Sequence, residues 1–515
     1  MPDNHPSTRW MPLVVLATGA FVASCSPPAD RRVTGKNNAD PTWGRQQAET
    51  AINVSHDFAG GTGEVISITF NDLTETDSTI LYTDSDRAIY PGASLLGWAY
   101  SDDHRQTWKY GGKVTPPEGW AVLWGDPAIT HLKDHFSTTT PPFYTNNQGY
   151  VFISNLAITN EDFAAAASED GAIHGALEHL SGACFARSTD FGRTFANWGC
   201  LSNNSHFYDG GSIVANETHV FAAYWDVNTK QVDVWLANAK DDLANFVSLG
   251  EPFPGYFVSG HAEMRIDEQG ALWVMAPVLV GEGNGHHELR LTTLQEFRWI
   301  EPVNPAPGLA LGFAPAGVVP LGPFTPDARI LRTAQQYSFD IGRGEYGGAA
   351  SAQVRTVAAS SDGVRYNFQG YQCPVASLDC SVVQGWTSGA AGDHFSPLVT
   401  YGYVSAITGQ GQWKLTYYSN EDDPNGVSIA VEQANLLRFP DGTGSVASVP
   451  LTVPHLVCSD NRGYWGDYDG LVALGAQELG GPNEFIVAYS DSSAGCYSRR
   501  EFTSGHVHVS AMVFQ

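Results

Sequence analysis

Short runs of apolar or alternating residues recur along most of the chain, separated by Gly, Pro, Asn and Asp. Runs of this kind, rich in β-branched and aromatic residues, predict β-strands. The clearest unit of four runs is Gly211–Ala215, Val220–Trp225, Val232–Ala237 and Phe246–Leu249. Similar units follow one another about seven times, which predicts an all-β fold, a seven-bladed β-propeller with six blades as the alternative.

The first run of each unit is expected to be an inner strand that lines a central channel. By this pattern the inner strands are Glu64–Asn71, Asp126–Leu132, Gly211–Ala215, Ala262–Ile266, Gly312–Pro320, Ser396–Gly402 and Gly470–Leu474. The last unit lacks an outer strand, and Ala51–His56 is expected to supply it, because an unpaired edge would otherwise stay open. The one helix-like insertion, Glu161–Leu180, falls between the second and third strands of the second unit.

Two segments between strand-like runs share the order Ser, Asp, Thr, aromatic. One is Ser188–Phe195, and a looser copy is Ser101–Trp108, with Arg105 where glycine is expected. A shortened echo is Ser360–Tyr366. Ser, Asp and Thr oxygens accept turn amides, and glycine takes a positive φ at low cost. The pattern resembles the Asp box (BNR repeat) of sialidase-type propellers, and this resemblance implies a sialidase-like fold in which the box is a structural turn.

Composition narrows the classes of partner. Charged residues make up only 16% of the 515 residues, and the formal net charge is -27. So negative a body excludes nucleic acid and anionic membrane surfaces as general partners. A monomer with a carbohydrate substrate is expected. No cofactor is expected to be required; calcium is possible at an exported acidic site, although no EF-hand-like loop supports it.

The N-terminus has the pattern of an export signal. Arg9 precedes a short apolar run, and Val22-Ala23-Ser24-Cys25 resembles a bacterial lipobox. The expected organisation is a lipoprotein signal peptide over 1–24, a tether over 25–46 and one propeller domain over 47–515. Lipid on Cys25 would be the only membrane contact, and the expected location is the bacterial outer membrane (periplasmic or cell-surface side) or the medium.

Six further cysteines form an even set, which in an exported chain predicts disulfides. Spacing suggests the pairs Cys184–Cys200, Cys373–Cys380 and Cys458–Cys496, although spacing alone does not fix connectivity. No motif supports a metal site.

Polar segments open several of the expected inner strands and therefore face one mouth of the channel. They contain carboxylates, histidines and tyrosines, which can act as general acids, bases or nucleophiles. The candidate catalytic residues are Asp126, Tyr208, Asp209, His261, Glu263, Asp393, His394, Asp467 and Tyr468. Further candidates are His206, His286, His287 and Tyr464.

Arginines and tryptophans on the same expected face are candidates for binding. Converging guanidinium groups bind carboxylates or sulfates, and indole rings stack on sugars. The candidate substrate-binding residues are Trp124, Arg87, Arg343, Arg462, Trp465 and Arg499, with Arg500 beside the last. Each candidate also has a structural alternative: a carboxylate can accept turn amides, a histidine or tyrosine can be a hydrogen-bonded wall, and a tryptophan can pack between blades.

The leading hypothesis is therefore an exported carbohydrate-active enzyme that cleaves a glycosidic bond of an anionic glycan at the channel mouth. The resemblance implies a sialidase-like glycoside hydrolase, in which a tyrosine–glutamate pair would involve Glu263. Related propellers include polysaccharide lyases, in which His394 or His261 would be the base. The alternative is a non-catalytic cell-surface propeller that binds a glycan or a protein.

Overall fold

The computed structural model describes a nearly all-β chain. The described residues are 31–32, 47–57, 63–72, 80–82, 87–133, 135–136, 144–145, 148–174, 182–202, 207–267, 270–281, 286–294, 319–324, 337–343, 352–361, 366–375, 380–387, 394–404, 411–419, 428–438, 444–450, 455–456, 470–474, 484–491 and 506–513. Within them, antiparallel strands form seven sheets of four or five strands.

The first four large sheets follow the chain in order, each with its inner strand first. The first contains β2 (Gln47–Asp57), β3 (Gly63–Asp72), β6 (Leu96–Ser101) and β7 (Lys109–Lys113). The second contains β8 (Trp120–His131), β11 (Val151–Thr159), β13 (Gly182–Ser188) and β14 (Ala196–Ser202). The third contains β15 (Tyr208–Ala215), β16 (His219–Asp226), β17 (Gln231–Asn238) and β18 (Val247–Gly250). The fourth contains β20 (Glu263–Ile266), β21 (Leu272–Val280), β22 (His286–Thr293) and β23 (Val319–Phe324), with β19 (Phe257–Val258) also on β21.

The remaining three large sheets repeat this arrangement. The fifth contains β24 (Tyr337–Arg343), β25 (Ala352–Ser361), β26 (Tyr366–Pro374) and β27 (Ser381–Thr387). The sixth contains β28 (His394–Val404), β29 (Gly411–Ser419), β30 (Ser428–Arg438) and β31 (Gly444–Pro450), with β32 (His455–Leu456) on β30. The seventh contains β33 (Gly470–Leu474), β34 (Glu484–Asp491), β35 (His506–Val513) and β1 (Arg31–Arg32).

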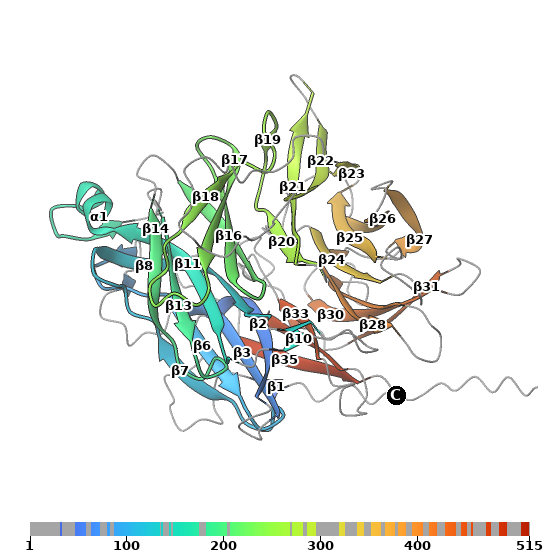
Figure 1. Cartoon of the computed structure of the whole chain (residues 1–515), viewed down its shortest axis with the longest axis horizontal. Helices are drawn as coiled ribbons and strands as arrows, with labels where there is room; N and C mark the ends of the chain where they lie inside the picture. Colours follow the sequence, from blue (N-terminus) through green and yellow to red (C-terminus); the bar gives the residue numbers. More distant parts are fainter. Residues whose placement is uncertain are drawn as a thin grey trace, which may run out of the picture.

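The inner strands form a closed ring. Each of β2, β8, β15, β20, β24, β28 and β33 contacts the next, and β33 contacts β2. Figure 1 shows the sheets fanning outward around β2, β20, β24 and β33. The β-propeller expected from the sequence is therefore confirmed, while the number of blades for the whole chain stays a prediction.

Two expected inner strands are wrong. Glu64–Asn71 lies in β3, the second strand of its sheet, because β2 precedes it as the inner strand. Ala51–His56 therefore does not complete the last sheet; Arg31–Arg32, within the expected tether, pairs with β35 there instead. Of Gly312–Pro320, the described residues Val319 and Pro320 begin the outer strand β23.

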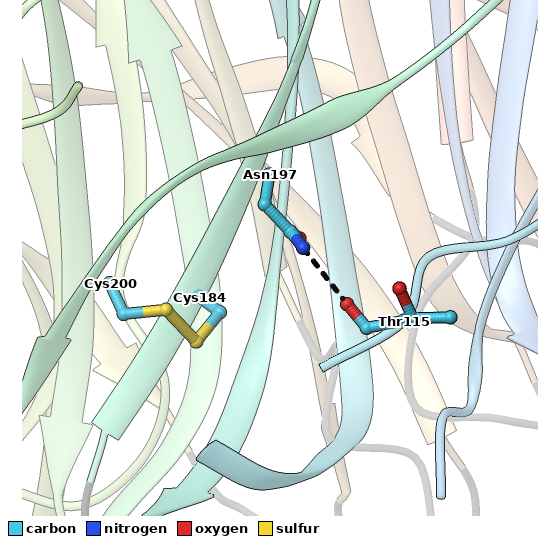
Figure 2. Close-up of a disulfide and its surroundings, with 4 residues drawn as sticks. All are labelled: Thr115, Cys184, Asn197 and Cys200. Carbon is cyan, nitrogen blue, oxygen red and sulfur yellow. Dashed lines mark hydrogen bonds between the residues drawn. A yellow bond between two sulfur atoms is a disulfide. The ribbon is translucent and has the colours of Figure 1, made fainter. Parts of the chain in front are cut away.

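Apolar side chains fill the space between neighbouring sheets. The middle strands β11 and β21 read as nearly continuous apolar runs, and almost all their residues are buried, as expected for strands covered on both faces. Between the second and third sheets, for example, Phe185 packs against Tyr224 and Phe246. The two described disulfides, Cys184–Cys200 and Cys373–Cys380, pair as predicted. Figure 2 shows that Cys184–Cys200 joins the neighbouring strands β13 and β14.

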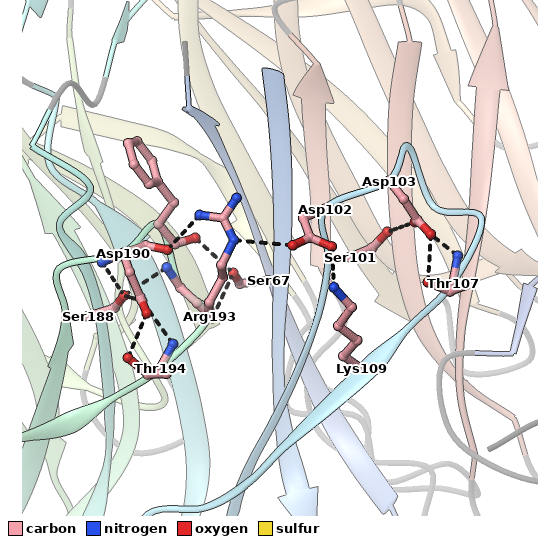
Figure 3. A network of polar contacts seen from close by, with 12 residues as sticks. Ser67, Ser101, Asp102, Asp103, Thr107, Lys109, Ser188, Asp190, Arg193 and Thr194 are labelled. Carbon is pink, nitrogen blue, oxygen red and sulfur yellow. Dashed lines mark hydrogen bonds and ion pairs between the residues drawn. The ribbon is translucent and has the colours of Figure 1, made fainter. Parts of the chain in front are cut away.

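The Asp boxes occupy the turns that join third to fourth strands, as expected. In Ser188–Phe195, Asp190 accepts hydrogen bonds from the Thr194 amide (2.9 Å) and hydroxyl (2.7 Å). In Ser101–Trp108, Asp103 makes the same two bonds with Thr107, at 2.9 and 2.6 Å. Figure 3 shows both boxes and the side chains between them. Ser360–Tyr366 differs: it joins β25 to β26, the second and third strands, so it is not equivalent to the other two.

The insertion in the second sheet is mostly not helical. The helix α1 covers Asn160–Ala166, and its N-cap Thr159 accepts a hydrogen bond from the Asp162 amide. The chain then forms β12 (Ile173–His174), which joins β5 (Arg87–Ile89) and β4 (Ile80–Tyr82) in a small sheet. Another pair is β9 (His135–Phe136) with β10 (Tyr144–Thr145). In Figure 1, α1 projects from the edge of the molecule, away from the ring of inner strands. No helix in the described part of the chain is both long and apolar enough to cross a membrane.

Candidate functional site at the channel mouth

The inner strands β15, β20, β24 and β28 begin at the same end of the ring, which we call the mouth. At the mouth, Asp209 on β15 lies opposite Trp225 on β16 in the strand register, so their side chains share one face of the sheet. His261, just before β20, brings its Nε2 to 3.4 Å from Asp209 Oδ2. The ring centroids of His261 and Trp225 are 6.0 Å apart.

A lysine completes this group. Lys230, in the turn between β16 and β17, places its ammonium 5.1 Å from the centroid of the Trp225 ring. Asp209, Trp225, Lys230 and His261 will be called the rim cluster. The Asp209 side chain keeps 38% of its surface exposed and that of His261 14%, so solvent reaches both partners.

Glycine is required where the histidine packs. A Cβ on Gly210 would lie 2.3 Å from His261 Cγ, and Gly210 has a φ of 59°. Asp126 Oδ2 accepts the Gly210 amide at 2.9 Å. Asp126 itself has a φ of 54°, which is uncommon outside glycine. The Asp126 carboxylate therefore fixes the backbone beside Asp209 and beneath the His261 ring.

A series of polar side chains links each inner strand to the next one around the ring. Ser212 accepts the Met264 amide, Glu263 accepts the Phe339 amide, and Asp340 accepts the Tyr401 amide. Asp126 belongs to the same series through Gly210. Two of the predicted catalytic carboxylates, Asp126 and Glu263, thus satisfy backbone groups between blades, which is the structural alternative for these residues.

Charged side chains continue down the channel below the mouth. On β20, His261, Glu263 and Arg265 alternate with buried residues, and Arg265 lies 3.3 Å from Glu263 and 3.8 Å from Asp340. Burial lowers the pKa of Lys133 to about 8, although the charges of Asp340 and Asp267 act in the opposite direction. Lys133 and Arg265 were missed in the sequence because neither stands at the start of an inner strand.

Tyr208 does not suit a role in proton transfer. Its side chain is fully buried, and its hydroxyl donates to Asp233 Oδ2 at 2.8 Å. Burial raises the pKa of Tyr208 far above the usual tyrosine value, and the neighbouring Asp233 charge adds to this effect. Trp124 is partly buried and packs against the core between the second and third sheets.

His287 forms a separate contact at the mouth side of the fourth sheet. Its Nδ1 lies 2.8 Å from Ser259 Oγ. Nearby, Arg290 pairs with Glu288 at 2.8 Å and stacks on Tyr256 at 4.6 Å. The charge of Arg290 is thus matched within its own sheet.

For some candidates only the backbone is described. His394 begins β28, and His286 begins β22. Arg87 begins β5 in the small sheet. Arg343 ends β24, at the opposite end of the strand from Tyr337, whose hydroxyl donates to the His261 carbonyl.

Other candidates lie outside the described residues. They are Cys25, His206, Asp393, Cys458, Arg462, Tyr464, Trp465, Asp467, Tyr468, Cys496, Arg499 and Arg500. Among the described residues, no group of three His, Cys, Asp or Glu side chains could hold a metal ion. The expectation about calcium stays a prediction.

Comparison with known proteins places the chain among distant propellers. No protein-family model matches it, and no curated protein matches it. Similar solved structures include an α-L-arabinofuranosidase from Fusarium graminearum (12% identity, 82% of this chain and 97% of that chain, TM-score 0.40). Others are the Penicillium chrysogenum α-L-arabinanase complexed with arabinobiose (11%, 82% and 98%, 0.42) and a Dyadobacter fermentans protein of unknown function (10%, 94% and 98%, 0.42). None of the three is described as a sialidase, and likenesses this distant carry no conclusion about activity.

Proposed function

We propose that the protein is an exported carbohydrate-active enzyme that cleaves a glycosidic bond of an acidic glycan at the rim cluster. The observation that carries the proposal is the Asp209–His261 pair, 3.4 Å apart, solvent-accessible and beside the Trp225 ring. A carboxylate next to an imidazole orients the ring and stabilises its protonated form, which suits proton transfer near neutral pH. An indole beside such a pair offers a surface for a sugar.

His261 is the proton-transfer group in this proposal, and Asp209 is its partner. If the reaction is elimination next to a uronate, His261 removes the proton and the bond to the leaving sugar breaks. If it is hydrolysis, His261 or Asp209 transfers a proton to the leaving oxygen or from water. A sialidase-like tyrosine–glutamate pair has less support, because Tyr208 is buried and Glu263 is bonded to the Phe339 amide and to Arg265.

Export and lipid attachment at Cys25 belong to the same proposal. The two described disulfides support an oxidising compartment. If Cys25 carries lipid, Cys25→Ser moves the protein from the membrane fraction to the soluble fraction. A membrane fraction that is unchanged by this substitution would contradict the anchor.

A glycan panel tests the reaction. Purified protein is incubated with galacturonan, chondroitin sulfate, sialyl-lactose and neutral arabinan, and both reducing ends and the ultraviolet absorbance of unsaturated uronates are measured. Absorbance with new reducing ends indicates a lyase, and reducing ends alone indicate a hydrolase. Asp209→Asn and His261→Gln should each lower the rate by roughly 10²–10⁴-fold, the usual contribution of a general acid or base.

The chain offers a matched control. Asp170 and His174 form a second exposed Asp–His pair at 2.9 Å, on the insertion at the edge of the molecule. Asp170→Asn should leave the rate unchanged. Binding without cleavage of any panel member would instead favour the non-catalytic propeller, an alternative supported by the structural use of Asp126 and Glu263.

A further inference from the structure

The turn that carries Lys230 holds a strained backbone. Asp226 organises this turn: its carboxylate accepts the Asn228 amide at 2.9 Å and the Thr229 hydroxyl at 2.7 Å. Its carbonyl accepts the Lys230 amide at 2.9 Å. Lys230 then has a φ of 58°, in the left-handed region where glycine or asparagine is preferred. A lysine at this position costs stability unless its side chain has a use.

The strained conformation places the Lys230 ammonium over Trp225. The Lys230 carbonyl accepts the Val258 amide at 2.8 Å, and Trp225 Nε1 donates to the Val258 carbonyl at 3.1 Å. The same short segment therefore holds both the turn and the ring. A cation–π contact orients an ammonium without cancelling its charge, which an ion pair with a carboxylate would do.

Lys230 has no ion pair among the described residues, in contrast to other cations on this side of the molecule. Arg265 lies 3.3 Å from Glu263, and Arg290 lies 2.8 Å from Glu288. A positive charge without a matching carboxylate is unexpected in a chain of net charge -27, and it lies beside the proposed proton-transfer pair.

We propose that Lys230, held by Trp225, forms a subsite for the acidic group of the glycan, a sugar carboxylate or sulfate, next to the bond that Asp209 and His261 act on. This inference rests on the proposed function for its location, but its central claim concerns binding. An ammonium offers three donors to an anionic oxygen cluster and tolerates several orientations. The subsite would select acidic over neutral sugars at the mouth.

Equilibrium binding tests the subsite. Isothermal titration is done with hexagalacturonate, a chondroitin sulfate hexasaccharide and carboxyl-reduced hexagalacturonate as the matched neutral sugar; in Asp209→Asn where wild type cleaves. Wild type should bind at least one acidic sugar more tightly than the neutral sugar. Lys230→Gln and Lys230→Gly should weaken that binding roughly tenfold, the loss of one charge-assisted contact, while Lys230→Arg keeps it within about threefold. Binding of the neutral sugar should not change.

Stability gives an independent readout. Lys230→Gly should raise the melting temperature by about 1–2 °C because it relieves the left-handed backbone, even as it weakens acidic-sugar binding. Lys240→Gln, an exposed lysine on the turn after β17, is the control and should change neither property.

Three results would overturn the subsite: equal affinity of wild type for acidic and neutral sugars, no loss in Lys230→Gln, or equal loss for both sugars. If no glycan is cleaved but Lys230 still selects acidic sugars, the reaction is wrong and the subsite stands. If cleavage depends on His261 but not on Lys230 or sugar charge, the reaction stands and the subsite is wrong.

Discussion

The two ends of the propeller use the same acidic and basic residue types in different ways. At the Asp-box end, Asp103 and Asp190 are bonded within their own turns, and Asp102 lies between Lys109 (2.7 Å) and Arg193 (3.3 Å). Figure 3 shows how these contacts connect the two boxes. At the mouth, Asp209 meets an imidazole and remains accessible, and Lys230 faces a ring instead of a carboxylate.

This difference separates structural from functional polar groups. A carboxylate that accepts several turn hydrogen bonds would lose them if it moved to bind a ligand. The mouth contains groups of this first kind as well, because Asp126 and Glu263 hold backbone amides of the next inner strand. Within the mouth, the rim cluster is therefore a better candidate site than the carboxylates that join the blades.

The largest expected effect distinguishes the two ends by activity. Asp209→Ala should lower the rate on the cleaved glycan by roughly 10²–10⁴-fold, because His261 loses the partner that orients it. Its unfolding free energy should change by less than about 1 kcal/mol, since Asp209 is accessible. Asp190→Ala should leave the rate per folded molecule unchanged. Steady-state rates and urea titrations of both variants check this, and similar rates for the two would remove the functional distinction.

The next effect concerns the hairpin β13–β14, which has an Asp box at one end and a disulfide near the other. Replacing Cys184 and Cys200 with alanine should lower the unfolding free energy by about 3 kcal/mol, because a crosslink across 16 residues restricts the unfolded chain. Urea titration measures it. Reductant should destabilise wild type, and in a variant lacking Cys373–Cys380 as well it should have no further effect through either of these two disulfides.

A smaller effect is expected at the Asp box itself. Asp190→Ala removes the acceptor for Ser188 and Thr194 and should cost about 1–2 kcal/mol. Burial raises the pKa of Asp190, but hydrogen bonds from Ser188 and Thr194 outweigh it and the pKa is lowered overall. The ionised form is thus favoured by folding, so the contribution is present above the unfolded value of about 3.9 and is lost as pH falls through the lower folded value.

Titrations between neutral and acidic pH check that direction. The stability gap between wild type and Asp190→Ala should shrink below about pH 4. Asp170→Ala, at an exposed site, is the comparison and should stay within about 0.5 kcal/mol of wild type at neutral pH. A gap that widens in acid would contradict the role of Asp190 as an ionised acceptor.

The sequence predicted the architecture better than the site. Strand runs and the Ser188–Phe195 box depend on local patterns, and they appear where expected. The assignment of inner strands failed at Glu64–Asn71, because pairing with β2 is not visible in a local pattern. His261 and Asp209 were predicted separately, but their contact depends on how two blades meet.

Trp225 and Lys230 were missed for the same kind of reason. Trp225 looked like the end of an ordinary strand, and only the register with Asp209 places it at the mouth. The positive φ of Lys230 has no sequence signal, since a lysine in a turn is common. Asp126 was predicted to be catalytic from its position, and sequence could not show that the Gly210 amide occupies its carboxylate.

The smallest effect compares the two Asp boxes at one equivalent position. Gly192 has a φ of 93° and Arg105 a φ of 67°, so both are left-handed. Arg105→Gly should raise the unfolding free energy by about 0.5 kcal/mol, because glycine adopts this conformation without steric cost but is more flexible when unfolded. Gly192→Ala should lower it by about 1–3 kcal/mol, since the new Cβ would lie 2.1 Å from the hydroxyl of the buried Ser67. Urea titration of both variants checks the opposite signs. Destabilisation by Arg105→Gly would show instead that the Arg105 side chain contributes more than its backbone conformation costs.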